Sequence, residues 1–246
     1  MRKIILIVLF CVVCQGVIRC QKSTETVNKN HTNENIFGNV KVDSNNRIKI
    51  EPSILESLST SSQSYLIHDK QLKRKSHREK FDVHYPEFTK NGDKLNIVNS
   101  VVLGRVIEEL PYENSDSKLD ISLNYKVTMN KENFISIVFD GDYNAEGAAH
   151  PMNLSFTINY DVKNDMLLSL SDVYSNDSFL ELIHGAMKKQ LDSNLVDAYD
   201  DLKVEEIEEQ IYDKYEGFYF KKDKLYVRLT IPSGSQYNGY VSFQYK

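Results

Sequence analysis

The sequence predicts an α+β domain in which an antiparallel sheet carries helices packed on one face. Two patterns lead to this fold class. Segments that alternate apolar and polar residues, as half-buried strands do, follow one another across short turns. Segments with apolar residues three or four positions apart, as in amphipathic helices, interrupt them. Strands joined by short turns pair antiparallel. The helices that interrupt them are expected to cover one face of the resulting sheet.

The first predicted helix follows an Asn-Gly turn at residues 91–92. Dipeptides of this kind tolerate the left-handed backbone that tight turns require. Four apolar residues then lie at helical spacing, and we expect them on the buried side: Leu95, Val98, Val102 and Val106.

The clearest period-two pattern lies at residues 119–129, where six apolar residues alternate with five polar ones. This pattern predicts a strand that is buried on one face. A turn at 130–133 leads into a partner strand at 134–140, and a third strand is predicted at 154–162 before a turn at 163–165.

The C-terminal third predicts two helices and three short strands. The first helix covers 176–191, and the second, at 203–216, belongs to a strongly acidic stretch. The chain closes with strands at 218–220, 225–231 and 240–245, separated by a turn at 221–224 and a loop at 232–239.

Residues 1–20 predict a secretory signal peptide. Two basic residues precede an apolar run at 4–13, which is shorter than the roughly 20 residues that a membrane-spanning helix needs. All three cysteines lie in this segment, so the chain after cleavage has no internal disulfide. Cys20 is a candidate for lipid attachment, but Arg19 stands where lipoprotein signals prefer a small residue. The sequence leaves lipid anchoring and plain secretion both open.

The net charge of −5 is unevenly distributed along the 246 residues. It divides into +3 over 1–20, +4 over 21–80 and −12 over 81–246. We expect 21–80 to be a polar, basic tether and 81–246 to be the extracytoplasmic domain. Because nucleic-acid binding needs an excess of Lys and Arg, the acidic domain argues against a nucleic-acid partner.

The densest polar cluster lies at 139–151 and predicts an ordinary loop between strands. Its alternating acidic residues resemble the start of a calcium loop, but Ala145 and Pro151 occupy positions where that loop needs Gly and a bidentate Glu. His150 with Glu146 lacks a third zinc ligand in the sequence. We therefore predict no metal and no cofactor.

Sequence motifs give little support to an enzyme. There is no G-x-S-x-G elbow, no Gly-rich phosphate loop and no cysteine after residue 20. A carbohydrate hydrolase with paired carboxylates stays an alternative, because 28 acidic residues in 81–246 offer many candidate pairs.

The order of motifs in 81–246 resembles a family of bacterial extracytoplasmic domains of unknown function. The segments that carry the resemblance are HYPEF, LNIVNSVV, GAAHP, SLSDVY, FYFKKDKLYVRL and IPSGSQYNGYVSFQY. This family includes the sensor domain of a lysozyme-responsive anti-sigma factor and a domain that accompanies some peptidoglycan and polysaccharide deacetylases. The resemblance implies an outward-facing, non-catalytic α+β domain.

The resemblance also implies a partner-binding region. In a relative that binds lysozyme, the loop between the last two strands lies across the enzyme's cleft, and the corresponding loop here is 232–239. The candidate partner-binding residues are Pro232, Tyr237, Tyr240, His150 and Pro151. Little chain precedes the apolar run and no deacetylase module is present, so we expect neither anti-sigma nor enzymatic activity.

Together these observations predict an exported, envelope-attached binding domain. Its expected partner is lysozyme, another cationic protein or the cell wall, and it meets the membrane only through a lipid or signal anchor. The alternatives are a carbohydrate-active hydrolase and a purely structural lipoprotein.

Overall fold

The computed structural model describes residues 50–59, 65–75, 79–111, 118–174, 178–190, 203–211, 215, 217–222, 224–230 and 236–242. All of them belong to one unit, Phe37–Lys246. The predicted signal peptide, Cys20 and the first part of the predicted tether lie outside the described residues.

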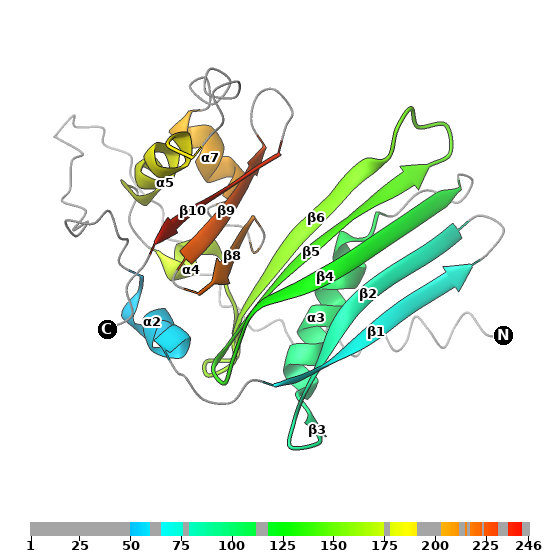
Figure 1. The fold of residues 1–246 in the computed structure, drawn as a ribbon, viewed down its shortest axis with the longest axis horizontal. Coiled ribbons are helices and arrows are strands. Elements are labelled where there is room, and N and C mark those ends of the chain that lie inside the picture. The colour runs from blue at the N-terminus through cyan, green and yellow to red at the C-terminus, as the bar shows by residue number, and fades with distance from the viewer. Residues whose placement is uncertain are drawn as a thin grey trace, which may run out of the picture. The chain divides into compact units, whose positions relative to one another are not determined.

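The main element is a seven-stranded sheet with the order β1-β2-β4-β5-β6-β7, in which β3 also pairs with β2 (Figure 1). The pairing of β2 with β4 is parallel, and the other pairings are antiparallel. The strands are β1 (Leu66–Lys75), β2 (Glu79–Lys90), β3 (Asp93–Lys94), β4 (Leu119–Lys131), β5 (Phe134–Ala145), β6 (Met152–Asp161) and β7 (Met166–Leu167).

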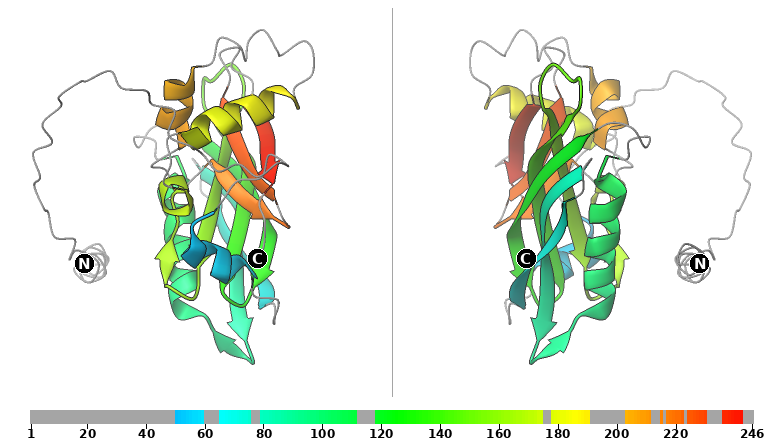
Figure 2. Two further views of the ribbon diagram at one scale, coloured as in Figure 1. Left: turned by 90° about the vertical axis from the view of Figure 1, so that its left-hand side faces the viewer. Right: turned by 90° about the vertical axis from the view of Figure 1, so that its right-hand side faces the viewer.

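Helix α3 (Asn96–Glu109) connects the β2–β3 hairpin to β4 and lies along one face of this sheet (Figure 2). The predicted positions Val98, Val102 and Val106 are buried there against the apolar side chains of the sheet. A parallel pair needs a crossover connection, and α3 provides it between β2 and β4. The predicted turn before the helix is also confirmed, with positive φ angles at Asn91 and Gly92.

A second sheet has three strands in the order β10-β9-β8, and its helices share a separate apolar core. Side chains of the large sheet, including Met129 and Phe134, complete this core. The elements are α2 (Pro52–Ser59), α4 (Leu170–Val173), α5 (Ser178–Lys188), α7 (Val204–Ile211), β8 (Phe218–Lys221), β9 (Lys224–Thr230) and β10 (Gln236–Ser242).

Buried hydrogen bonds join the second sheet to the large one. The backbone N–H of Phe220 donates to Ser136 Oγ (3.0 Å), and Asn159 Nδ2 donates to the carbonyl oxygen of Phe218 (2.8 Å). Ser136 Oγ in turn donates to Asn159 Oδ1 (2.7 Å). Buried polar side chains need such partners, and these bonds fix where β8 meets β5 and β6.

The predicted tether at 21–80 is wrong for its described C-terminal part, because α2, β1 and the start of β2 belong to the fold. In α2, Ile54 and Leu58 are buried, and Ser57 Oγ donates to the buried Asp161 (2.9 Å). β1 is an edge strand, and edge strands commonly carry exposed charges that discourage pairing with other chains. Its basic composition therefore resembles that of a linker.

The α+β class is confirmed, and the structure adds one parallel pairing and the division into two sheets. The predicted acidic helix at 203–216 is shorter than expected, since α7 ends at Ile211 and Tyr215 is exposed beyond it. Among the described helices, none is long and apolar enough to cross a membrane.

Candidate functional site

One face of the large sheet is covered at one end and open at the other. In β5, residues 134–139 are all buried, whereas Asp140, Asp142 and Asn144 are exposed. In β6, the side chains from Thr157 to Asp161 are buried, but Asn153 is exposed. The second sheet and its helices cover this face only as far as these positions.

We call the uncovered part the open face. It is formed by polar side chains from five strands: Gln71, Lys73, Asp82, His84, Ser122, Asn124, Asp140, Asp142, Asn153 and Ser155. Half of them form one continuous row across the sheet, in which each residue is the register partner of the next: Lys73, Asp82, Ser122, Asp142 and Asn153. Asn124, Asp140 and Ser155 are partners in a neighbouring row.

This arrangement corrects the predicted loop at 139–151. β5 continues to Ala145, so its acidic residues alternate because successive side chains of a strand point to opposite faces. The loop is confined to the few residues between β5 and β6. Within the described part of the chain, no group of three His, Cys, Asp or Glu side chains could hold a metal ion.

The open face ends at a cluster of Asp140, Ser155 and Arg228. Arg228 extends from β9 of the second sheet, and its Nη2 lies 2.7 Å from Asp140 Oδ1. Ser155 Oγ donates to the same oxygen at 3.0 Å and accepts a hydrogen bond from Arg228 Nη1. The Arg228 side chain is 20% exposed and that of Asp140 is 60% exposed, so this ion pair lies at the border between covered and open surface.

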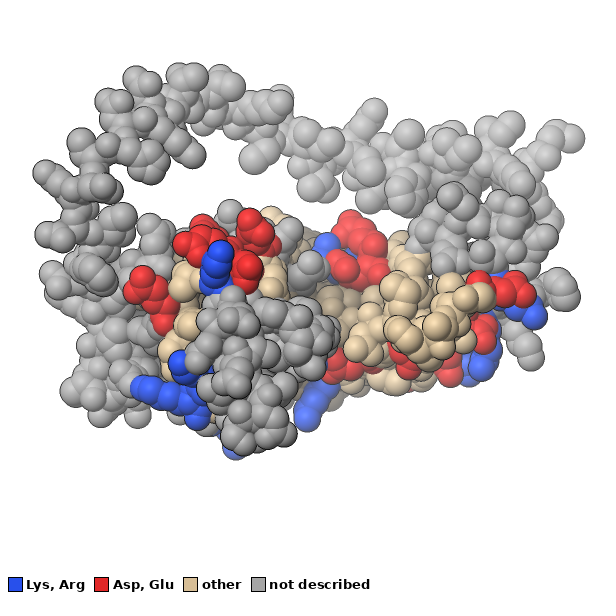
Figure 3. Space-filling model, turned by 90° about the horizontal axis from the view of Figure 1, so that it is seen from above, with Lys and Arg blue, Asp and Glu red and all other residues tan. Residues whose placement is uncertain are grey.

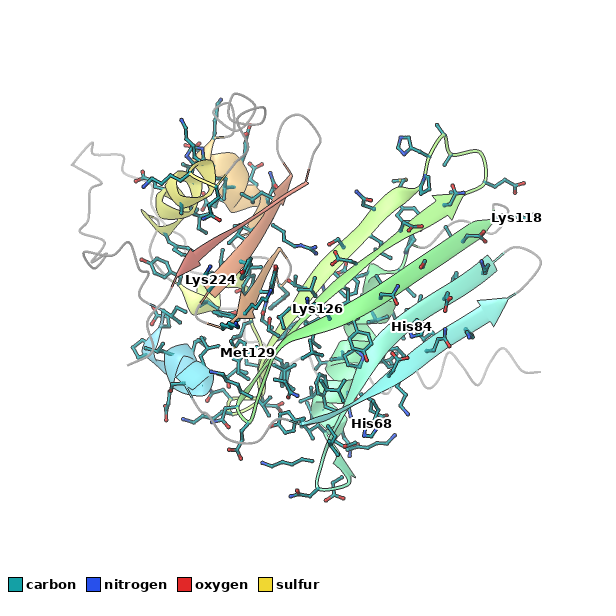
Figure 4. All side chains as sticks on the ribbon, in the orientation of Figure 1. His68, His84, Lys118, Lys126, Met129 and Lys224 are labelled. Atoms are coloured by element: carbon teal, nitrogen blue, oxygen red, sulfur yellow. The ribbon has the colours of Figure 1, made fainter. Side chains whose placement is uncertain are left out.

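A second polar cluster surrounds His84 on β2 (Figure 4). Its Nδ1 lies 2.9 Å from Asp69 Oδ2, and its Nε2 lies 3.4 Å from Asp82 Oδ1. Gln71 hydrogen-bonds both His84 and Asp82. Asp69 also accepts a hydrogen bond from Tyr125, whose pKa is raised by burial and then by this carboxylate.

Two tyrosines of the second sheet stack on the side of β9 that carries Arg228. Tyr219 and Tyr226 are register partners whose rings stack at 4.8 Å with planes 8° apart. The register places Tyr240 of β10 beside Tyr226. Lys126 is exposed on β4, which contacts β8 as β5 and β6 also do (Figure 4).

The structure does not bring all the predicted partner-binding residues together. His150 and Pro151 are exposed between β5 and β6, whereas Tyr237 and Tyr240 lie in β10 of the other sheet. The register pairs Tyr237 with Leu229 and Tyr240 with Tyr226. The predicted loop at 232–239 overlaps β10 from Gln236 onward, and Pro232 lies outside the described residues.

The sequence prediction missed the role of Arg228 and Ser155. Ser155 could have been found, because it is in phase with Asn153 on the polar side of the predicted third strand. Arg228 carries no local signal, since it reaches Asp140 from a strand 88 residues away in the sequence.

Comparisons with known proteins give partial similarities. No protein-family model matches the chain. The chain is 24% identical over 138 residues to the peptidoglycan-N-acetylmuramic acid deacetylase PdaC of Bacillus subtilis (strain 168), which covers 56% of this chain and 29% of that protein. The chain therefore spans about three tenths of the length of this relative.

Two solved structures of the DUF3298 family are also similar in fold. One, from Pseudomonas aeruginosa PAO1, has a TM-score of 0.49 and 14% identity, and the match covers 74% of this chain and 89% of that one. The other, from Bacteroides fragilis NCTC 9343, has a TM-score of 0.41 and 14% identity, with 72% and 90% covered.

Proposed function

We propose that the protein is an exported, non-catalytic domain that binds cell-wall glycan on the open face. The observation that carries this proposal is the uncovered end of the large sheet, where five strands present amide, hydroxyl, imidazole and carboxylate groups side by side. These groups supply both donors and acceptors, as the hydroxyl and acetamido groups of an amino-sugar polymer require. The similarity to part of a peptidoglycan deacetylase supports the cell wall as the source of the ligand.

The dimensions of the open face suit an extended polymer. Neighbouring strands are about 4.8 Å apart, so a row that crosses five strands is roughly 19 Å long. The row from Lys73 to Asn153 is unbroken in register and therefore offers successive contacts along one line.

The open face suits binding better than hydrolysis. Asp140 and Asp142 are two residues apart on one strand, which places their backbones roughly 7 Å apart. Separations of this order occur in inverting glycosidases, but the catalytic acid of such an enzyme needs an environment that excludes water. Both carboxylates here are exposed, and Asp140 is already bonded to Arg228 and Ser155.

Sedimentation of the purified chain with insoluble peptidoglycan tests this function. We expect the protein to sediment, and Asn124→Arg at the centre of the open face to weaken binding by about tenfold or more, since it places a long charged side chain where the glycan lies. Ile107→Arg is the matched control, because it introduces the same side chain at an exposed site on α3, which covers the other face. Failure of the unaltered protein to sediment would remove the proposal.

The acidic charge supports a second candidate partner, a cationic protein such as lysozyme. Residues 81–246 carry a net charge of −12, although the surface seen from above shows groups of acidic side chains next to basic ones (Figure 3). Attraction of this kind is screened by salt. Calorimetric titration with lysozyme at low and moderate salt, run beside the sedimentation, separates the two partners.

A further inference from the structure

The two oxygens of the Asp140 carboxylate have different surroundings. Oδ1 accepts from Arg228 Nη2 at 2.7 Å and from Ser155 Oγ at 3.0 Å. Among the described contacts, none involves Oδ2, and the Asp140 side chain is 60% exposed. One oxygen is therefore held by the protein while the other is available on the open face.

The contacts at Oδ1 fix the orientation of the free oxygen. Two donors on one oxygen restrict rotation of the carboxylate, and Arg228 is itself held because its guanidinium bonds both Asp140 and Ser155. A fixed acceptor loses little conformational entropy when a ligand binds, which favours affinity.

The guanidinium also determines which donors this oxygen prefers. A hydroxyl or amide N–H that donates to a carboxylate forms a charge-assisted hydrogen bond, which is stronger than a neutral one. An ammonium group would gain less, because Arg228 already offsets the negative charge and repels a second cation. The site therefore favours an uncharged donor over a cationic one.

We infer that Oδ2 of Asp140 anchors an uncharged, N-acetylated amino-sugar glycan by accepting a hydrogen bond from one of its hydroxyl or amide groups. This inference rests on the proposed function and names the glycan class that the open face prefers. Arg228 acts as a positioning residue, since it holds the carboxylate and offsets its charge. A de-N-acetylated glycan, whose amines are protonated, is the disfavoured form.

Calorimetric titration with a hexamer of N-acetylglucosamine and with its de-N-acetylated counterpart at about pH 6 tests this selection. We expect the unaltered protein to prefer the N-acetylated hexamer, and Asp140→Asn to weaken that binding by about 10- to 100-fold, the range of a charge-assisted hydrogen bond. Asp93→Asn is the matched control, because it makes the same change at an exposed residue of β3, outside the open face. We expect it to change binding by less than about threefold.

Substitution of Arg228 separates positioning from a merely structural role. With Arg228→Met, the charge of Asp140 is no longer offset, so we expect the preference between the hexamers to move toward the cationic one by about tenfold. Arg228→Lys keeps the charge and should retain the original preference. Equal weakening for both hexamers in Arg228→Met would show a structural role and overturn the selection.

Other outcomes also decide the question. If Asp140→Asn binds like the unaltered protein, or if Asp93→Asn weakens binding as much as Asp140→Asn does, the anchor is wrong. Sedimentation with peptidoglycan can still support the proposed function in that case. Absence of binding to the N-acetylated hexamer by the unaltered protein also overturns the inference. If Asp140→Asn does not fold, Ser155→Ala removes one donor from Oδ1 and is expected to weaken binding by about threefold, and unchanged binding contradicts the inference.

Discussion

Gly141 allows β4 and β5 to lie together at the centre of the open face. A Cβ at this position would lie 2.0 Å from the carbonyl oxygen of Ser122 and 2.8 Å from Cα of Leu123. Both are backbone atoms, which cannot move aside as the end of a flexible side chain can. Gly141 separates Asp140 from Asp142, so the close approach of these strands also places two carboxylates of the open face.

Gly141→Ala is expected to lower the free energy of unfolding by about 1–3 kcal/mol or more, because the added methyl group forces the two strands apart. Gly104→Ala is the matched control in α3, where a Cβ would meet nothing within 4 Å. That substitution is expected to raise stability by about 0.5–1 kcal/mol through helix propensity. Urea denaturation measures the free energy of unfolding of both variants. Equal changes in the two would contradict the close approach of β4 and β5 at Gly141.

At the scale of single residues, sequence patterns identify buried positions better than they identify the site. Helical spacing correctly placed Val98, Val102 and Val106 inside, because this periodicity is local. The cluster around Asp140 depends on Arg228 from another sheet, and no local pattern records such a contact.

At the scale of elements, α2 is a structural part of the domain. Ile54 and Leu58 are fully buried in the core of the second sheet, and the backbone N–H of Glu51 donates to the carbonyl oxygen of Val173 at 3.0 Å. Ser57 adds a buried hydrogen bond to Asp161, which also accepts from Asn164.

Leu58→Ala is expected to cost about 2–5 kcal/mol of stability, the range for large-to-small changes in a packed core. Ser53→Ala, at an exposed position of the same helix, is the control and is expected to change stability by less than about 0.5 kcal/mol. Thermal unfolding distinguishes the two variants. If these residues were a tether, neither substitution would change stability. An unchanged midpoint of thermal unfolding for Leu58→Ala would therefore contradict the fold described for α2.

Elements with a one-sided apolar pattern were predictable, and elements whose place depends on distant partners were not. β4 was predicted because its alternation is complete within one strand. β1 was missed because an edge strand carries charged residues, and the division into two sheets was missed because strand pairing is decided by contacts far apart in the sequence.

At the scale of the whole molecule, both apolar cores contain tyrosines whose pKa is raised. Burial is the largest cause for Tyr65, Tyr160 and Tyr174, and for Tyr160 a hydrogen bond to Asp165 adds to it. Tyr65 and Tyr160 belong to the core beneath α3, and Tyr174 belongs to the core of the second sheet.

These tyrosines predict a loss of stability at alkaline pH. Above about pH 10 the unfolded chain releases phenolic protons that the folded protein retains, so the free energy of unfolding falls as pH rises. Tyr160→Phe is expected to lower stability at pH 8 by about 1 kcal/mol through the lost hydrogen bond. The same substitution is also expected to reduce the fall in the free energy of unfolding between pH 8 and about 10.5. Urea denaturation at the two pH values measures the fall in stability. If Tyr160→Phe loses as much stability between them as the unaltered protein does, the Tyr160 phenol does not contribute to the alkaline loss.

The parallel contact between β2 and β4 joins two antiparallel blocks of the large sheet. β1 and β2 form one block, β4, β5 and β6 form the other, and α3 connects the two along the chain. Their register covers only Glu79–Val83 against Leu119–Leu123, and parallel pairing is slightly weaker per residue. This seam runs through the open face between Asp82 and Ser122. A glycan that spans the row would hold the two blocks together, so the ligand would act as a brace on the sheet that binds it.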